Sequence, residues 1–372
     1  MLHPIERLPE EWREALPGEP AFRAVQVFRW IHQRGVVDAE RMSNLPKALR
    51  ARLVEEGLSA PLVLEHVHRS SDASRKLLVR ALDGASIETV LLPVARVAED
   101  ADASAAEDDE EEVDPARVTQ CISTQVGCAM GCVFCASGVA GLKRHMSAAE
   151  VVTQVLLARA QLEPGETLRN IVFMGMGEPL HNYDATARAV RLFTHAEGMG
   201  LSPRRITVST SGLVPEIDRL GADFDGKVAL AISLHAADDA RRSALVPVNQ
   251  RYPLEELMGA LRRYPLQKRR RITIEYTLIA NQNDALDDAR KLVRLLRGLP
   301  VKVNLIPMNP IAHSELGPSP EERVAAFQKI LIDAGYLCFI RRRRGDDVAA
   351  ACGQLALLGG KPTRRFLARQ PS

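Results

Sequence analysis

Residues 127–138 read GCAMGCVFCASG and set Cys128, Cys132 and Cys135 at the spacing C-x3-C-x2-C. A structural zinc site would need a fourth ligand, and the neighbouring sequence offers no obvious one. Iron–sulfur clusters usually take four thiolates, so three thiolates on a four-iron cluster leave one iron open. An open iron can bind the amino and carboxylate groups of a substrate. The motif therefore favours a cluster that performs chemistry.

Strand-like runs alternate with helical stretches from residue 117 onward. The helical stretch 147–162 begins with a capping box, Ser147-x-x-Glu150. Repeated strand–helix units predict an α/β fold in which six parallel strands form a partial (βα)6 barrel. A further strand and a loop carrying Cys352 are expected from residue 334. The six predicted strands are QCISTQ (120–125), NIVFMG (170–175), RITVST (205–210), VALAISLH (228–235), RITIEYTLI (271–279) and VKVNLIPMN (301–309).

Residues 1–95 predict an N-terminal accessory domain of helices and a β-hairpin. Apolar residues recur at helical spacing in residues 22–35 and again in 45–57. Two strand-like runs follow within residues 76–93, and Asp83-Gly84 between them is a strong hairpin signal. This small domain precedes the predicted barrel, which spans residues 117–358.

The charge of the chain is unevenly distributed. Residues 99–114 hold ten acidic groups and no basic ones, so the rest of the chain carries 49 basic and 37 acidic residues, a balance of about +12. Residues 96–116 predict a solvated, disordered insert, and a regulatory or RNA-mimicking role is the other interpretation. The basic remainder, including the tail 359–372, favours a polyanionic partner, although basic surfaces are also common on merely soluble proteins. The runs 268–271 and 341–344 fit phosphate contacts or a solvated edge equally well.

Composition also indicates where the protein works. Six cysteines in 372 residues are too few for a disulfide scaffold, and Cys338, within an apolar run, is expected in the core. The chain contains no apolar stretch long enough for a transmembrane helix. Its charged first residues lack the apolar region of a signal peptide. We therefore expect a cytoplasmic protein without membrane contact, and we expect it to be a monomer.

The cysteine spacing, with Phe134 before the last cysteine, resembles the radical S-adenosylmethionine (SAM) superfamily. Small or polar residues at the ends of successive predicted strands extend the resemblance. It implies one [4Fe-4S] cluster held by Cys128, Cys132 and Cys135, with SAM bound at the strand ends. The implied SAM-binding residues are Gly177, Glu178, Ser209, Ser233, Leu234, His235 and Asn309.

A larger set of motifs resembles the RlmN/Cfr family of RNA adenosine methyltransferases across roughly residues 20–358. It includes CISTQVGCAMGCVFCASG, VFMGMGEPL, RRITVSTSG, ALAISLHA, VNLIPMNP and RGDDVAAACGQL. The resemblance implies methylation of C2 of an adenosine in 23S ribosomal RNA, at the peptidyl-transferase centre, and in transfer RNA. It further implies two SAM molecules per turnover and a flavodoxin-type reductant. The alternatives are methylation of C8, as in the resistance branch of the family, and an iron–sulfur RNA-binding protein without catalysis.

The same resemblance implies roles for three residues outside the cluster motif. Cys352 would carry the methyl group as S-methylcysteine, and a radical formed from that group would add to the adenine. Glu88 would then accept the ring proton, and Cys121 would attack Cys352 to release the product and leave a Cys121–Cys352 disulfide. The alternative readings are a buried strand cysteine for Cys121, a small loop residue for Cys352 and an outward-facing carboxylate for Glu88.

Overall fold

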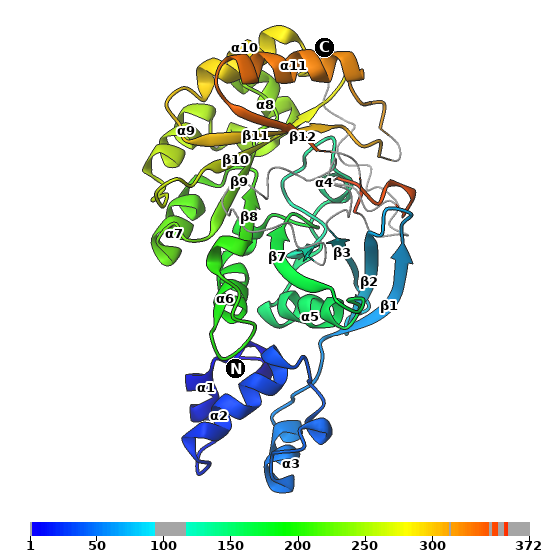
Figure 1. Cartoon of the computed structure of the whole chain (residues 1–372), viewed down its shortest axis with the longest axis vertical. Helices are drawn as coiled ribbons and strands as arrows, with labels where there is room; N and C mark the ends of the chain where they lie inside the picture. Colours follow the sequence, from blue (N-terminus) through cyan, green and yellow to red (C-terminus); the bar gives the residue numbers. More distant parts are fainter. Residues whose placement is uncertain (1, 94–116, 312–313, 342–343, 349–352, 356–372) are drawn as a thin grey trace.

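The computed structural model describes residues 2–93, 117–311, 314–341, 344–348 and 353–355 (Figure 1). Its largest sheet has the strand order β1-β2-β3-β4-β7-β8-β9-β10-β11-β12, and all neighbours from β4 to β12 are parallel. The predicted α/β class and partial barrel are therefore confirmed, and the expected further strand follows the sixth. The parallel strands are β4 (Arg117–Cys121), β7 (Thr167–Phe173), β8 (Ile206–Thr210), β9 (Ala229–Ser233), β10 (Ile272–Leu278), β11 (Val301–Pro307) and β12 (Leu337–Ile340).

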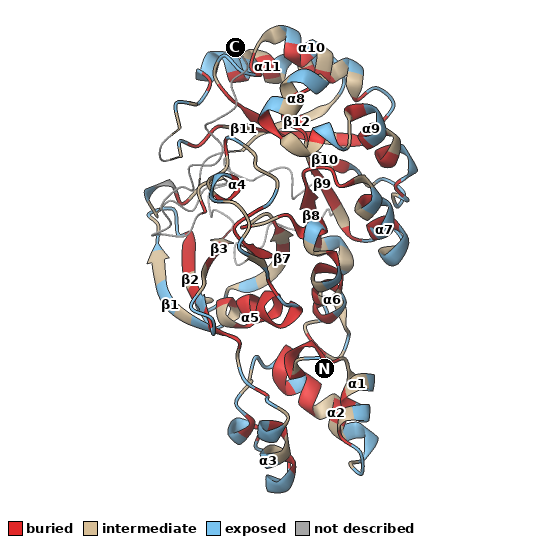
Figure 2. Cartoon of the chain, turned by 180° about the vertical axis from the view of Figure 1, so that it is seen from behind, coloured by how far each residue is buried: buried red, intermediate tan, exposed pale blue. Residues whose placement is uncertain are grey.

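Helices that connect the parallel strands cover the outer side of the curved sheet (Figures 1 and 2). Most of these helices bury their apolar face and expose the opposite face, as the spacing of their apolar residues predicts. The exception is the first, whose sequence AAEVVTQVLLAR is apolar almost all round and is buried on nearly every side. It begins at the predicted capping box, in which Ser147 and Glu150 exchange hydrogen bonds of 2.9 and 3.1 Å. The connecting helices are α5 (Ala148–Arg159), α6 (Tyr183–Thr194), α7 (Val214–Phe224), α8 (Asp239–Leu245), α9 (Leu254–Arg263), α10 (Leu286–Leu295) and α11 (Glu321–Asp333).

The predicted hairpin is part of the barrel's own sheet. Its strands β2 (Arg75–Ala81) and β3 (Ser86–Pro93) turn at Asp83-Gly84, and β3 pairs antiparallel with β4. A further strand, β1 (Leu62–Arg69), forms the edge of the sheet. β1 was not predicted, because its residues LVLEHVHR are largely exposed or half-buried and show no clean alternation. The sheet therefore continues from the accessory region into the barrel without a break.

The N-terminal helices form a lobe of their own below the barrel in Figure 1. These are α1 (Pro9–Ala15), α2 (Ala21–Phe28) and α3 (Lys47–Glu55), and α2 continues into a π-helical turn, Arg29–Gln33. The predicted helix 22–35 is thus one continuous segment with a change of pitch. Two guanidinium nitrogens of Arg159, at the end of α5, donate to carbonyls within that turn at 2.8 Å each, which ties the lobe to the barrel.

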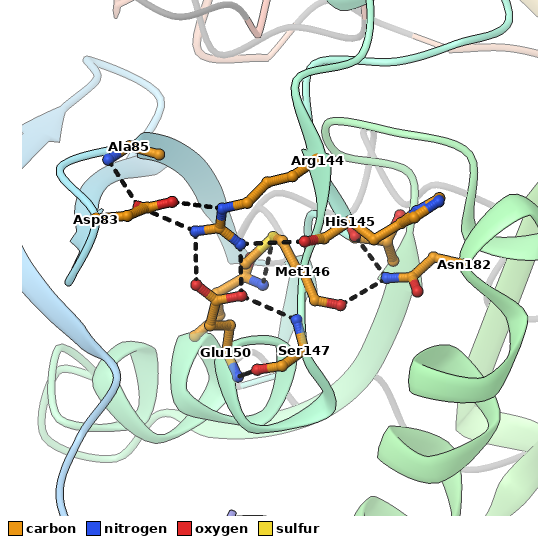
Figure 3. A network of polar contacts seen from close by, with 10 residues as sticks. Asp83, Ala85, Arg144, His145, Met146, Ser147, Glu150 and Asn182 are labelled. Atoms are coloured by element: carbon orange, nitrogen blue, oxygen red, sulfur yellow. Dashed lines mark hydrogen bonds and ion pairs between the residues drawn. The ribbon is translucent and has the colours of Figure 1, made fainter.

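One polar network joins the hairpin turn to the beginning of α5 (Figure 3). Arg144 donates to both carboxylate oxygens of Asp83, at 2.6 and 3.1 Å, and to both oxygens of Glu150, at 2.9 and 2.8 Å. Nearby, the side-chain amide of Asn182 donates to the carbonyl of Met146 at 2.7 Å. Three segments that are distant in sequence are thereby fixed beside the loop that carries the cysteine motif.

The run 205–210 ends with β8, but most of the predicted strand runs continue past the end of the observed strand. The last residues of these runs leave the sheet at the carboxyl end of the barrel. This is seen at residues 122–125, 174–175, 234–235 and 308–309. In α/β barrels this end carries the active site, and the residues that leave the sheet here include several of those predicted to bind SAM.

Candidate functional site

The cysteine motif occupies the loop that follows β4 at the carboxyl end of the barrel. A two-stranded ribbon of β5 (Gln125–Val126) and β6 (Arg144–His145) closes the base of this loop. A short helix, α4 (Ala136–Ala140), begins directly after Cys135. The loop is thus fixed at both ends, as a site with preset ligand positions requires.

Two glycines let the backbone of this loop fold tightly around the cysteines. A side-chain carbon at Gly127 would lie 1.9 Å from the carbonyl oxygen of Gly141. One at Gly138 would lie 2.9 Å from backbone atoms of Cys132. Real side-chain carbons do not approach so closely, so glycine is needed at both positions.

The three motif cysteines line one cavity of about 160 Å³ inside the mouth of the barrel. Six of the seven predicted SAM-binding residues line the same cavity. Among the residues that the structure describes, no group of three His, Cys, Asp or Glu is arranged to hold a single metal ion. The six strand-end residues are Gly177, Glu178, Ser209, Ser233, His235 and Asn309.

The donor set fits an iron–sulfur cluster with one open iron. Cys128, Cys132 and Cys135 are the cysteines in the described part of the cavity wall, and thiolates are the usual ligands of such clusters. Burial raises the pKa of Cys128 to about 12, so this group remains a thiol at neutral pH. Binding to iron would have to displace its proton, which makes cluster assembly sensitive to pH.

Leu234 is the predicted SAM residue that does not line the cavity. Its side chain is fully buried, and its backbone N–H donates to the carbonyl of Glu275 at 3.0 Å. Its carbonyl accepts a hydrogen bond of 3.0 Å from Arg242. Leu234 therefore belongs to the packing behind the cavity.

Glu178 links two strand ends across the cavity. One carboxylate oxygen accepts hydrogen bonds of 2.8 Å from both the N–H and the hydroxyl of Ser211, and the other accepts from the N–H of Leu180 at 3.0 Å. Burial nevertheless raises the pKa of Glu178 above its ordinary value. The carboxylate is thus held in place but poorly solvated, and a cationic ligand group in the cavity would stabilise its charged form.

The backbone before Glu178 approaches the segment after β4 very closely. A side-chain carbon at Gly175 would lie 2.7 Å from the carbonyl oxygen of Ile122. One at Gly177 would lie 2.5 Å from the Cβ of Gln125, and Gly177 has a φ of +102°. The two glycines of GMGEP are therefore required by packing.

His235 is held as a neutral hydrogen-bond donor. Its Nδ1 accepts from the N–H of Thr277 at 2.9 Å, and burial lowers its pKa to about 3. With Nδ1 as acceptor, the proton of the neutral ring lies on Nε2. The ring also packs edge-on against Phe134, with 4.7 Å between ring centroids, so the cysteine loop and the end of β9 contact each other directly.

Two further residues that shape the cavity gave no signal in the sequence. Ser211 lines the cavity beside Glu178, and Arg242 lies behind it with its side chain fully buried. Arg242 donates to the carbonyls of Ser211, Ser233 and Leu234, which joins the ends of β8 and β9. Because Arg242 lies on a helix among other arginines, only the tertiary structure distinguishes it.

Cys121 and Glu88 lie on the same face of the sheet. Val90 of β3 pairs with Lys76 of β2 on one side and with Cys121 of β4 on the other, so these three residues form a row across three strands. Glu88 lies two residues before Val90 and shares its face. Leu92 and Thr119 are on this face as well, and they line a second cavity inside the barrel.

Glu88 is buried and paired, so the outward-facing carboxylate considered for it is not what the structure contains. Its side chain is 3% exposed, and its Oε1 lies 2.9 Å from the Nζ of Lys76, whose side chain is 5% exposed. The carbonyl of Glu88 accepts a hydrogen bond of 2.6 Å from Ser123, just after Cys121. The carboxylate is thus fixed by its ion pair and by its neighbours in the sheet.

Cys352 lies outside the described residues, but the chain on both sides of it is anchored. Before it, Asp347 accepts hydrogen bonds from Ser70 and Ser71 at the turn between β1 and β2, and these bonds lower its pKa. After it, the carbonyl of Gly353 accepts a 2.9 Å hydrogen bond from Ala136 of α4, and Gly353 lines the cysteine cavity. One anchor is at the β1–β2 turn and the other is at the cysteine loop.

The remaining predictions concern Cys338, the charged segments and membrane-spanning helices. Cys338 is 5% exposed on β12, as expected for a core residue. The acidic run 99–114 and the tail 359–372 lie outside the described residues. Of the basic runs, Arg270, Arg271 and Arg341 line the second cavity. In the part of the chain that the structure describes, no helix is both long and apolar enough to cross a membrane.

Comparison with known proteins agrees with this arrangement. A family model for the radical SAM superfamily matches residues 122–296, and one for the ribosomal RNA large subunit methyltransferase N-terminal domain matches residues 10–57. A Sorangium cellulosum protein named dual-specificity RNA methyltransferase RlmN is 66% identical over 98% of each chain. A protein of the same name from Nitratiruptor is 44% identical over 90% of this chain and 93% of its own. The crystal structure of a radical SAM methyltransferase from Sphaerobacter thermophilus superposes with a TM-score of 0.85, at 46% identity, over 94% of this chain and 98% of that one.

The packing at Gly177 predicts a specific loss of stability. Gly177→Ala adds a methyl group that would lie 2.5 Å from the Cβ of Gln125, in a backbone conformation with φ of +102°. We expect the substitution to cost about 2–4 kcal/mol, from the strained φ and the overpacking together. The midpoint of urea unfolding measures this loss.

Gly165→Ala is the matched control for that experiment. Gly165 also has a positive φ, of +84°, but a side-chain carbon there meets no atom within 4 Å. Gly165→Ala should therefore lower the free energy of unfolding by only about 1 kcal/mol, from the backbone conformation alone. Equal losses in the two variants would contradict the close approach at the mouth of the barrel.

Proposed function

Because the chain belongs to the RlmN family of radical SAM RNA methyltransferases, we propose that it methylates C2 of an adenosine in RNA. The substrates are 23S ribosomal RNA, at the peptidyl-transferase centre, and transfer RNA, at the adenosine beside the anticodon. One observation carries the proposal. A carboxylate, Glu88, and a cysteine, Cys121, share the interior face of the barrel, and the cavity lined by three further cysteines opens at the end of that face.

The superfamily uses a [4Fe-4S] cluster and SAM, and this chain carries the residues to hold them. Cys128, Cys132 and Cys135 would bind the cluster, and Glu178 and His235 would face the bound SAM. When bound, the cluster and SAM supply the methyl group and the one-electron chemistry that activates it. Glu178 is suited to an ammonium group because it is a buried carboxylate, and His235 is suited to an acceptor because its Nε2 carries the proton.

The protein needs a methyl carrier because C2 of adenine is electron-poor and is not nucleophilic. A thiolate can accept a methyl group that such a carbon cannot accept directly. Cys352 is proposed as this carrier. The anchors at Asp347 and Gly353 support the assignment, since they hold the chain before and after Cys352 at the β1–β2 turn and at the cysteine cavity.

Glu88 is proposed to accept the proton from C2 once the new bond to carbon has formed. A general base must be ionised before it acts, and burial opposes ionisation of a carboxylate. The Lys76 ammonium, 2.9 Å away, offsets that cost through its ion pair with the carboxylate. Lys76 is therefore a positioning residue for Glu88.

Cys121 is proposed to release the product. Its thiolate attacks the sulfur of Cys352 and forms a Cys121–Cys352 disulfide, while the bond from that sulfur to the methylene carbon on C2 breaks. The methylene carbon keeps the electron pair of that bond and takes up a proton to become the methyl group. Each turnover then ends with an oxidised cysteine pair, so an external reductant is required. We propose a flavodoxin-type donor for the electrons, and a cytoplasmic monomer as the working form.

Replacing any one cluster cysteine should abolish iron binding. Cys128→Ala, Cys132→Ala and Cys135→Ala each remove one of three thiolates, and two thiolates cannot retain a four-iron cluster. The iron and sulfide content of anaerobically reconstituted protein measures the effect. Cys338→Ala is the control, because Cys338 is buried on β12 and should leave four irons per chain. Stoichiometric zinc without iron in the unaltered protein would refute the cluster.

Cys121→Ala should trap the RNA on the protein. Without the resolving thiol, the bond between Cys352 and the adenine forms but is not broken, so a covalent adduct accumulates. A denaturing gel with labelled RNA detects it, and the double variant Cys121→Ala/Cys352→Ala should form none. Normal turnover by Cys121→Ala, with no adduct, would show that Cys121 has only a packing role.

A further inference from the structure

A second cavity, of about 180 Å³, lies at the amino ends of the parallel strands. It is lined by residues early in their strands, such as Thr207 in β8, Thr273 in β10 and Lys302 in β11. The cysteine cavity is lined instead by residues late in the same strands, such as Ser209 and Thr277. The two cavities therefore occupy opposite ends of the barrel interior.

The second cavity is strongly basic. Among the described residues in its wall, Glu275 is the carboxylate, with a 3.0 Å hydrogen bond from Asn304 and an ion pair of 3.9 Å to Arg341. The rest of the wall is made of hydroxyl, amide and apolar side chains, and the hydroxyls and amides add hydrogen-bond donors that phosphate groups use. The cationic residues are Arg204, Arg205, Arg270, Arg271, Lys302 and Arg341.

This cavity adjoins both the cysteine cavity and the face that carries the proposed catalytic residues. Met174, Glu275 and Arg341 line both cavities and so form the wall between them. Thr119, two residues before Cys121 on the same face, lines the second cavity. A base that entered from this end would move along the face of Cys121 toward the cysteine cavity.

The cysteine loop, with Cys128 and Phe134, and the segment around Gly353 surround the cavity at the opposite end of the barrel. The N–H of Ala136 and the hydroxyl of Ser137 hold that segment against α4. The amino end instead presents exposed arginines, Arg204 and Arg271, at its rim.

We infer that RNA enters through the amino end of the barrel and that its backbone phosphates are bound by the cationic residues of the second cavity. This inference rests on the proposed function, for which it names the RNA-binding surface. The arginines and lysine bind phosphates irrespective of sequence, so they supply affinity and orientation. The choice of the adenine then belongs to the residues on the interior face.

The test is RNA binding by Arg204→Glu/Arg271→Glu. Both side chains are exposed, so reversing their charge buries no new charge. The control, Arg290→Glu/Arg323→Glu, makes the same charge change on exposed positions of the outer helices α10 and α11. Fluorescence anisotropy with a labelled transcript of the peptidyl-transferase region, at several salt concentrations, gives the affinity of each.

We expect the first pair to raise the apparent Kd about tenfold at low salt and to reduce the slope of log K against log salt by about two. The apparent Kd of the control pair should differ from that of the unaltered protein by less than about twofold. Equal affinities for the two pairs would overturn the inference. If the charge reversal lowers iron content, the neutral pair Arg204→Gln/Arg271→Gln is measured in the same way and must show the same loss of slope.

Methylation of Cys352 in the absence of RNA separates this inference from the proposed function. Peptide mass spectrometry detects that methyl group without any contribution from RNA binding. If Arg204→Glu/Arg271→Glu retains methylation of Cys352 but loses RNA affinity, the result supports RNA entry at the amino end of the barrel. An unaltered protein that binds RNA through these arginines but never methylates Cys352 would refute the proposed function and leave the basic surface in place.

Discussion

The antiparallel pairing of β3 with β4 is the interaction on which the rest of the arrangement depends. It joins a hairpin from the N-terminal region to the first strand of a parallel barrel and aligns Lys76, Val90 and Cys121 in one row. Without this pairing, Glu88 would be an exposed hairpin carboxylate far from any cysteine. With it, a buried ion pair and a thiol share one face of the barrel interior. A short stretch of backbone hydrogen bonding therefore assembles groups that are more than thirty residues apart in sequence.

The mouth of the barrel depends on a second constraint, the close approach of backbone segments. Gly175 and Gly177 allow the end of β7 to meet the chain after β4, and Glu178 then reaches Ser211 at the end of β8. Arg242 joins the next pair of strand ends from behind. Because these contacts occupy polar atoms with protein partners, the cavity keeps its shape before any ligand binds. Such preorganisation suits chemistry in which reactive groups must be held apart from water.

Much of this could be predicted from local sequence, and the remainder could not for definite reasons. The cysteine spacing, the GMGEP turn, the capping box at Ser147 and the Asp83-Gly84 turn are local patterns, and the structure contains each of them. The strand β1, the burial of Glu88 and the cross-strand role of Arg242 depend on partners remote in the chain, which leave no periodic signal. The second cavity could not be predicted from local sequence either, because its cationic residues come from four separate segments.

We propose that this chain methylates C2 of adenosine in RNA. The decisive experiment is nucleoside mass spectrometry of ribosomal and transfer RNA from cells with and without the gene. We expect 2-methyladenosine in both RNAs when the gene is present and its loss when the gene is deleted. A return of 2-methyladenosine with the unaltered gene, but not with Cys352→Ala, would tie the product to the proposed carrier. Unchanged 2-methyladenosine after deletion, or loss of 8-methyladenosine in its place, would refute methylation of C2 by this protein.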